Sequence, residues 1–310
     1  MPHACDSSPR LQDFVTPDWL ATLIRQAKLE DMGPASIDIT SQLFVPAHLQ
    51  SSAAIRSRKA GILAGEAIIP MILAEYDAAL TYTAHLHDGQ SIDAGGTIGV
   101  IQGPLRSILS AERVVLNFLT HLGGIATLTA AYVKAAAGTR AGIYDTRKTI
   151  PGLRGLHKYA IVCGGGKNHR MGLFDAVLVK DNHIAHHPHD TLGSALQHAI
   201  QTAQAYQPAP SFIEVEVDDL VQLESLLRSS TKPSMILLDN MTNEQMTRAV
   251  QLRDELAPAV ELEASGGVNL QTVAGIARTG VDRIAVGALT HSAPALDIGL
   301  DITMPSSTQP

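Results

Sequence analysis

The sequence predicts an incomplete α/β barrel of about six parallel strands, preceded by a mixed α+β domain. After residue 140, short apolar runs rich in β-branched residues alternate with amphipathic helical stretches. Alternation of this kind predicts parallel strands joined by crossover helices. No dinucleotide-binding fingerprint accompanies the runs, so a barrel is favoured over an open Rossmann sheet. The expected strands lie within 142–147, 175–182, 212–218, 235–240, 261–267 and 283–288, and the expected helices within 191–206, 218–230, 243–256 and 269–280.

The first part of the chain has a less regular order. A helix is expected over 19–33, where a glycine ends it as glycines often do. Strands are expected around 52–63, followed by a helix over 65–76 and a Gly-rich strand series over 82–104. The stretch 107–138 predicts a long helix with a Gly-Gly interruption.

Composition narrows the class of protein. The 310 residues carry a net charge of -7, which argues against non-specific binding to nucleic acid or to an anionic membrane. The two cysteines have no paired spacing, which suits a reducing compartment. No basic-then-apolar leader opens the chain, and the longest apolar run, 67–76, is too short to span a bilayer. These features predict a cytoplasmic globular protein with no nucleic-acid or membrane partner.

Functional side chains stand where the expected strands end. In an α/β barrel the active site lies at the carboxyl ends of the strands. The residues at these ends are Thr146, Arg147 and Lys148, then Lys180, Glu216, Asp239, Ser265-Gly266-Gly267 and Val286-Gly287. Barrel phosphate sites are commonly built from the loops after the last two strands, so the glycines are expected to hold phosphate; tight turns are the alternative.

A cationic segment lies between the first two strands. The stretch "VCGGGKNHRMG", residues 162–172, places His169 and Arg170 directly after three glycines. Together with Arg147, Lys148 and Lys180 these cations would repel one another unless an anion offsets them. Arginine favours planar carboxylate or phosphate groups. An anionic ligand is therefore expected, with a solvated basic face as the alternative.

Two carboxylates accompany the cations. Glu216 and Asp239 lie on the next two strands. Carboxylates beside a phosphorylated ligand typically hold Mg²⁺ partly through substrate oxygens and water. We therefore expect Glu216 and Asp239 to bind Mg²⁺, or to pair with the lysines, or both.

The motifs that carry these residues resemble quinolinate phosphoribosyltransferase, also called nicotinate-nucleotide pyrophosphorylase (carboxylating). The similar stretches are "YDTRKTIPGLR", "HKYAIVCGGGKNHRMGLFDAVLVKDNHI", "IEVEVDDL", "ILLDNM", "LEASGGVN" and "IAVGALTHS". The resemblance implies transfer of phosphoribose from phosphoribosyl pyrophosphate to quinolinate, with Mg²⁺, giving nicotinate mononucleotide, pyrophosphate and CO₂ in NAD biosynthesis. It also implies a type II phosphoribosyltransferase fold with an N-terminal domain and dimerisation helix over 1–120, a barrel over 121–290, and a segment 291–310 that packs back on the N-terminal domain. The assembly is expected to be a homodimer with shared active sites, possibly a higher oligomer.

The resemblance assigns roles residue by residue. Arg147, His169, Arg170 and Lys180 look like contacts to the two quinolinate carboxylates, and Lys148 lies between that pocket and the ribose pyrophosphate. Glu216 and Asp239 would meet the ribose hydroxyls and the metal. Lys148, Lys180, Glu216 and Asp239 are the expected catalytic residues. Phosphate would be held at Ser265, Gly266, Gly267 and Gly287, with His291 close by, and Val286 would be among the substrate-binding residues. Arg113 resembles an arginine that the neighbouring subunit inserts, Arg58 is a weaker match to another basic contact, and Thr146 belongs to the same motif as Arg147.

Departures and alternatives remain open. The family usually has an acidic residue where His157 stands, and a fuller motif where this chain reads "GPASIDITS". A related molybdenum-associated subgroup shares the fold but typically lacks the "KDNH" that follows the second strand here. Other readings are a Schiff-base lyase using Lys148 or Lys180, a non-catalytic phosphosugar-binding barrel, and a transition-metal site at His183, His186, His187 and His189, for which surface histidines are the simpler explanation.

Overall fold

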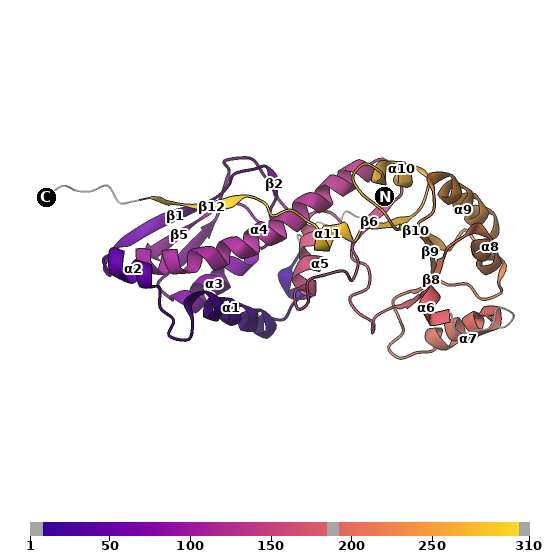
Figure 1. Cartoon of the computed structure of the whole chain (residues 1–310), viewed down its shortest axis with the longest axis horizontal. Coiled ribbons are helices and arrows are strands. Elements are labelled where there is room, and N and C mark those ends of the chain that lie inside the picture. The colour runs from indigo at the N-terminus through magenta and orange to yellow at the C-terminus, as the bar shows by residue number, and fades with distance from the viewer. Residues whose placement is uncertain (1–8, 185–191, 304–310) are drawn as a thin grey trace. The chain divides into compact units, whose positions relative to one another are not determined.

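A computed structural model describes residues 9–184 and 192–303 of the chain. Contacts divide the chain into two compact units. One comprises residues up to Ala130 together with Gly155–Gly165 and the segment from Ser292, and the other comprises Ala131–Arg154 and Gly166–His291. The domain boundaries expected from the sequence stay a prediction. Each unit has its own sheet (Figure 1).

The N-terminal unit is built on a four-stranded antiparallel sheet of order β12-β1-β5-β3. Strand β1 lies between β5 and β12, so Ala53 pairs with Ile101 on one side and with Ile302 on the other. A two-stranded ladder, β2-β4, accompanies the sheet. The bounds are β1 Gln50–Ser57, β2 Gly61–Ile62, β3 Thr81–Ala84, β4 Ser91–Ile92, β5 Thr97–Pro104 and β12 Ile298–Thr303.

The helices of this unit begin and end as the local sequence dictates. Helix α1 starts after Thr16, whose hydroxyl accepts a hydrogen bond from the Trp19 N–H, and it ends at Gly33, which has a φ of 67°. The helices are η1 Leu11–Asp13, α1 Pro17–Met32, α2 Ile39–Phe44, η2 Glu66–Ile68, α3 Ile69–Tyr76 and α5 Arg154–Cys163. The helices and strands expected up to residue 104 are confirmed, whereas α2, α5 and β12 were not expected.

Helix α4, Leu105–Ala136, is the longest element and crosses the boundary between the units. The expected Gly-Gly interruption is wrong, because the helix continues through Gly123 and Gly124. A Cβ at Gly124 would lie 2.2 Å from the Pro294 carbonyl oxygen, so glycine is required there by close backbone approach. Among the described helices α4 alone has the length and apolar composition to cross a membrane, but 56% of its most apolar window is buried, as in a core helix. It also exceeds the run at 67–76, which is therefore not the longest apolar stretch.

The second unit holds a six-stranded parallel sheet of order β6-β11-β10-β9-β8-β7. Strands β6 and β7, the first two of this unit, stand at the two ends of the sheet and do not pair with each other. The barrel is therefore incomplete, as predicted. The strands are β6 Gly142–Tyr144, β7 Val177–Val179, β8 Ile213–Val217, β9 Met235–Asp239, β10 Glu261–Ser265 and β11 Arg283–Ala285. All six expected strands are confirmed.

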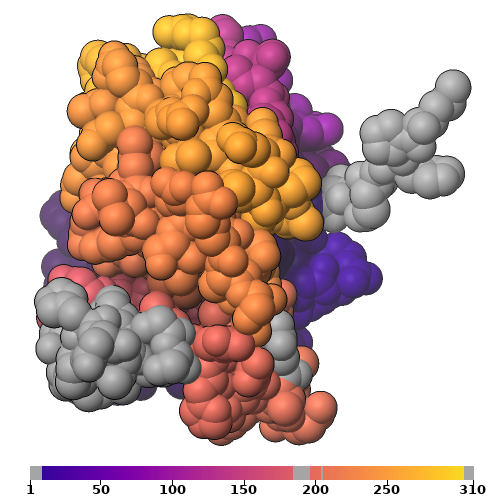
Figure 2. Space-filling view, turned by 90° about the vertical axis from the view of Figure 1, so that its right-hand side faces the viewer, coloured from indigo at the N-terminus to yellow at the C-terminus, as the bar shows by residue number. Residues whose placement is uncertain are grey.

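Helices alternate with these strands, and the four expected helices are confirmed. They are α7 Leu192–Gln204, α8 Leu220–Arg228, α9 Asn243–Leu256 and α10 Val273–Arg278, with short turns α6 Asp181–Ile184 and α11 Ala288–His291. Helix α9 starts with a capping box between Thr242 and Gln245. Residues of this unit, coloured coral to orange, make up most of the surface seen in Figure 2. The strand register pairs Ser265 with Asp239, which brings the carboxyl ends of the strands to one edge.

Candidate active site

A cavity of about 630 Å³ opens at the carboxyl ends of the barrel strands. This volume is typical of sites for small ligands. Its walls come from the segments after β6, β7, β9 and β10 and from the loop that precedes β7. The lining residues are Thr146, Arg147, Lys148, His169, Arg170, Leu178, Lys180, Leu237, Asp239, Asn240, Glu263, Ser265, Gly266, Gly267 and Ala285. A larger groove of about 780 Å³ beside Phe174 and Tyr206 is mainly apolar and holds none of the predicted site residues.

The structure brings most of the predicted residues to this one cavity. Ten of them line it: Thr146, Arg147, Lys148, His169, Arg170, Lys180, Asp239, Ser265, Gly266 and Gly267. Strand register explains the clustering, because parallel strands end at the same edge of a sheet. The functional roles of these residues stay predictions, whereas their proximity is a property of the fold.

Four other predicted residues belong to the barrel unit but do not line the cavity. Glu216 does not line the cavity but pairs with Lys180, which does. A Cβ at Gly287 would lie 3.0 Å from Lys148 Cδ and 3.3 Å from His291 Nε2, so these three residues are neighbours. Val286 is buried, and its N–H donates to the Tyr144 carbonyl at 2.9 Å.

Arg58 and Arg113 belong to the N-terminal unit. Arg58 is paired with Asp301 of β12 through both terminal nitrogens. The Arg113 side chain is 61% exposed and lies 3.9 Å from the Glu112 carboxylate. Such an exposed and distant ion pair contributes little to stability.

Arg147 and Lys148 are neighbouring cations of the cavity. Within residues 9–184 and 192–303, neither Arg147 nor Lys148 has a carboxylate partner. The Nε of Arg147 is moreover buried without any hydrogen-bond partner in the described part of the chain. A buried donor left unsatisfied is costly, and an anion that accepts its hydrogen bond removes that cost.

Arg170 adds a third positive charge at the same place. Its side chain is 8% exposed, and its Nη1 donates to the Ala176 carbonyl at 3.2 Å. Burial and the neighbouring Arg147 charge lower the pKa of Arg170, so both effects disfavour the charged state until an anion is present. The cavity is therefore organised to receive negative charge.

Lys180 is held by two partners at the end of β7. Its Nζ forms a close ion pair with Glu216 of β8, and its backbone N–H donates to Nδ1 of His183 at 2.8 Å. His183 thus has a local structural contact. The other histidines of the considered metal site, His186, His187 and His189, lie outside the described residues.

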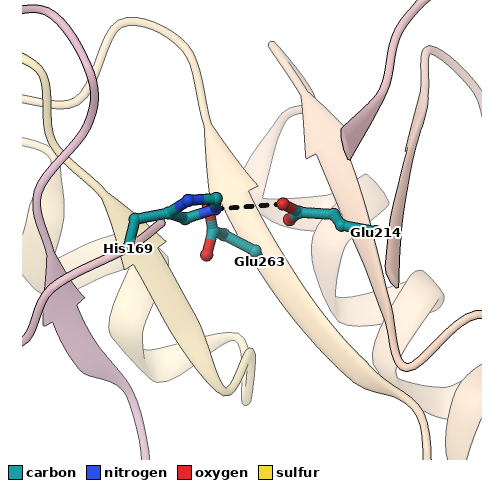
Figure 3. Close-up of side chains that lie close together, drawn as sticks. All are labelled: His169, Glu214 and Glu263. Carbon is teal, nitrogen blue, oxygen red and sulfur yellow. Dashed lines mark hydrogen bonds and ion pairs between the residues drawn. The ribbon is translucent and has the colours of Figure 1, made fainter. Parts of the chain in front are cut away.

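Two buried carboxylates of the site, Glu214 of β8 and Glu263 of β10, were not predicted from the sequence. Both are fully buried, and both face the imidazole of His169 (Figure 3). Nε2 of His169 lies 3.0 Å from Glu214 Oε2 and 3.4 Å from Glu263 Oε1. A signal was available, because "IEVEV" and "ELEAS" place glutamates at alternate positions of apolar strands, which puts each pair on one face.

Charge compensation at this cluster is local. The Nε of Arg283 lies 3.2 Å from Glu263 Oε2. Burial, followed by the Glu263 charge, raises the pKa of Glu214 to about 7. Burial opposes ionisation of His169, but hydrogen bonds and charges from both glutamates outweigh it and raise the pKa of His169 to about 9.

Asp239 and Glu216 fit a Mg²⁺ ion better than the cluster of His169, Glu214 and Glu263 does. Asp239 lines the cavity and Glu216 is fixed by Lys180, so oxygen ligands are available where a phosphorylated substrate would add its own. Within the described residues, the one set of three side chains close enough to share an ion is His169, Glu214 and Glu263. It includes a nitrogen ligand, is buried and is already balanced by Arg283, which suits a hydrated magnesium ion poorly.

The glycine loop after β10 has a backbone that other residues would strain. Gly266 has a φ of 92°, and a Cβ there would lie 2.1 Å from Asn240 Oδ1. Gly267 has a φ of 61° but open space around it. The loop can therefore present its backbone directly to the cavity.

Family comparison agrees with this arrangement. Residues 38–123 match the N-terminal domain of quinolinate phosphoribosyl transferase, and residues 125–301 match its C-terminal domain. The chain belongs to the quinolinate phosphoribosyl transferase family. A nicotinate-nucleotide pyrophosphorylase (carboxylating) from Mycobacterium leprae is 45% identical over 281 residues, covering 90% of this chain and 95% of that protein.

Other members of the quinolinate phosphoribosyl transferase family are similar over most of the chain. A quinolinate phosphoribosyltransferase (decarboxylating) from Nicotiana tabacum is 40% identical over 296 residues, covering 91% of this chain and 82% of that protein. A solved nicotinate-nucleotide pyrophosphorylase from Francisella tularensis superposes with a TM-score of 0.83 at 36% identity, covering 93% of this chain and 98% of that one. The predicted family and fold are confirmed.

Proposed function

We propose that the chain transfers phosphoribose from phosphoribosyl pyrophosphate to the ring nitrogen of quinolinate and releases pyrophosphate and CO₂, giving nicotinate mononucleotide for NAD biosynthesis. The observation that carries the proposal is that, among the described residues, Arg147 and Lys148 have no carboxylate partner and lie at the same cavity as the buried Arg170. A pyridine dicarboxylate supplies two negative charges and planar acceptors for guanidinium groups. Family membership points to the same substrates.

Charge placement explains how the cavity would promote the reaction. Attack of the pyridine nitrogen on the anomeric carbon breaks the bond to pyrophosphate and passes through an oxocarbenium-like state. Lys148 would stabilise negative charge on the departing pyrophosphate, while the carboxylates of Glu216 and Asp239 would favour the developing positive charge on the ribose. The glycine loop of Gly266 and Gly267 would hold phosphate through backbone N–H groups.

Decarboxylation follows from the first step. Once the ring nitrogen carries the ribose, the pyridinium ring accepts the electron pair of the breaking bond to the adjacent carboxylate, and a proton then replaces CO₂. The role of Arg147 and Arg170 is to hold the two carboxylates in register with the ribose, and positioning of this kind can contribute much of the rate enhancement.

We propose Mg²⁺ as the cofactor, with Asp239 and Glu216 as the residues that would hold it. When bound, Mg²⁺ would neutralise charge on the pyrophosphate group. The chemistry of the donor set supports this assignment, since carboxylates together with substrate oxygens are the usual ligands.

We propose a homodimer in which Arg113 of each chain reaches the other's active site. The support is the resemblance of Arg113 to the family's inserted arginine, together with its exposed side chain and its distant partner Glu112. A cytoplasmic location, a higher oligomer and the absence of nucleic-acid and membrane partners stay predictions. The relatives lend no support to the Schiff-base lyase or to the molybdenum-associated subgroup.

A turnover assay tests the proposed function. The protein is incubated with quinolinate, phosphoribosyl pyrophosphate and Mg²⁺, and CO₂, pyrophosphate and nicotinate mononucleotide are quantified. The expected result is equimolar formation of all three products. Pyrophosphate release without CO₂, or no turnover of quinolinate by folded protein, would refute the proposal.

A further inference from the structure

The imidazole of His169 is engaged by the protein at both ring nitrogens. Nε2 faces Glu214 Oε2 at 3.0 Å and Glu263 Oε1 at 3.4 Å (Figure 3). Nδ1 accepts a hydrogen bond from the backbone N–H of Arg170 at 2.8 Å. The ring therefore connects the buried floor of the barrel to the backbone of a residue that lines the cavity.

The hydrogen bonds fix which nitrogen carries the proton. Because Nδ1 accepts from Arg170, the proton lies on Nε2, where the Glu214 carboxylate accepts it and the Glu263 carboxylate lies 3.4 Å away. The glutamates also raise the pKa of His169 to about 9 against the opposing effect of burial, but a second proton on Nδ1 would break the bond from the Arg170 N–H. In this structure the hydrogen bond from the Arg170 N–H to Nδ1 therefore favours the neutral imidazole with its proton on Nε2.

Further contacts hold the backbone and the ring of His169. The backbone N–H of His169 donates to Oδ1 of the fully buried Asp145 at 2.7 Å. The edge of the ring packs against Phe212, with centroids 5.0 Å apart and an interplanar angle of 86°. The backbone N–H groups of residues 169 and 170 are thus both held by buried side chains. These two hydrogen bonds restrict the position of the Arg170 backbone, from which its side chain extends.

We propose that Glu214 and Glu263 are positioning residues that act through His169 to hold Arg170 in place for a substrate carboxylate. This inference rests on the proposed function, since it concerns how that substrate is oriented. The expectation that His169 itself contacts the substrate carboxylate stays a prediction. Direct contact would require a ring N–H that donates to the substrate, whereas the positioning role uses both ring nitrogens within the protein.

The two glutamates differ in how fully they serve His169. Glu263 forms an ion pair with Arg283 as well as with His169, whereas in the described part of the chain Glu214 pairs with His169 alone. Glu214 is therefore the better position for a test. Glutamine at 214 keeps an oxygen that can accept from Nε2–H, and leucine of similar size cannot.

The kinetic test compares Glu214→Leu with Glu214→Gln. For Glu214→Leu we expect KM for quinolinate to rise on the order of tenfold, the usual effect of an unmade buried hydrogen bond. KM for phosphoribosyl pyrophosphate should stay at the wild-type value, and Glu214→Gln should restore most of the quinolinate affinity. Glu261→Gln is the control, because Glu261 lies on β10 outside the cavity lining, with a side chain that is 55% exposed.

Two outcomes would overturn the inference: an unchanged KM for quinolinate in Glu214→Leu, or an equal rise of KM for both substrates, which indicates general loosening. Thermal denaturation checks that each variant is folded. If Glu214→Leu does not fold, ¹⁵N NMR of histidine-labelled wild-type protein decides. A proton on Nε2 and a bare Nδ1 at His169 support the inference, and a proton on Nδ1 overturns it. Wild-type turnover tests the proposed function separately, because the proton position is measured without substrate.

Discussion

Lys148 lies where the anion-binding pocket and the expected pyrophosphate position meet. It lines the cavity and has no carboxylate partner in the described part of the chain, so no ion pair of the fold depends on its charge. Its backbone is held instead, since the Thr290 hydroxyl donates to the Lys148 carbonyl at 2.7 Å. An unpaired cation on a fixed backbone indicates a role in binding or catalysis.

Substitution of Lys148 should separate catalysis from folding. We expect Lys148→Ala to lower kcat by about 10²–10³, the effect of removing one group that stabilises transition-state charge. The free energy of unfolding should change by less than about 0.5 kcal/mol, as for other surface substitutions. Lys232→Ala is the control, because Lys232 precedes β9 at the opposite ends of the strands. Near-native kcat in folded Lys148→Ala would contradict the assignment.

His157 forms a buried contact with a second histidine. It is fully buried in α5, and its Nε2 lies 2.8 Å from Nε2 of His121 in α4. Burial, followed by the neighbouring His121, lowers the pKa of His157 to about 4, and burial lowers that of His121 as well. Two imidazoles in contact cannot both be charged at low energetic cost, whereas an acidic residue could pair with a charged His121.

This pair makes stability depend on pH in a defined direction. Because the folded pKa of His157 is lowered from 6.5, the unfolded chain binds more protons, so stability is full above pH 6.5 and falls as pH drops toward about 4. Between pH 7 and 5 the loss from His157 should be about 1–2 kcal/mol. Urea denaturation at both pH values should show a smaller loss in His157→Asn than in wild type. An identical pH dependence in the two proteins would contradict this account.

The loop after β10 connects backbone geometry to substrate binding at the scale of an element. Gly266 needs both a positive φ and free space next to Asn240, while Gly267 needs only the positive φ. If the loop holds phosphate, the two positions should differ in their sensitivity to a side chain.

We expect Gly266→Ala to raise KM for phosphoribosyl pyrophosphate by about tenfold or more, because strain and collision displace the loop. Gly267→Ala should have a smaller effect, since it adds strain alone. Gly138→Ala is a matched control, with a φ of 82° and open space but no place in the cavity. Steady-state kinetics with varied phosphoribosyl pyrophosphate measure the difference. Equal KM values in all three variants would separate the loop from phosphate binding.

Elements were predictable from the sequence where one local pattern determines them. Most of the parallel strands are short, mainly apolar runs, so Lys180 after β7 and Asp239 at the end of β9 could be placed at strand ends without a structure. Strand β12 was missed because it gains its partners from β1, which is distant in sequence. The Gly-Gly pair in α4 misled because glycine is required there by close approach of Pro294, and this tertiary contact overrides helix propensity.

Contacts within the site were less predictable than its location. Glu214 and Glu263 belong to different strands, and their meeting at His169 depends on barrel register. The His121–His157 pair depends on packing between α4 and α5. In both cases the chemistry depends on pairs that only the folded chain brings together.

Assembly can be tested at the scale of the whole molecule. Arg113→Ala and Lys148→Ala should each be inactive alone. Mixing them under conditions that allow subunit exchange should restore activity to about a quarter of wild type, since a mixed C₂ dimer has one site with both lesions and one with neither. Exchange is verified by mass spectrometry of differently tagged chains. If exchange is complete and activity stays at the level of the separate variants, Arg113 acts within its own chain or not in catalysis.

The claim that the cavity recognises a dicarboxylate is tested most directly by the ratio of kcat/KM for quinolinate to that for nicotinate. Nicotinate lacks the second carboxylate, so it would leave buried donors such as Arg147 Nε unpaired. Sites built around a polar group reject analogues without it strongly, and we predict a ratio of at least about 10³ with saturating phosphoribosyl pyrophosphate and Mg²⁺. Comparable kcat/KM values for the two acids would contradict the account.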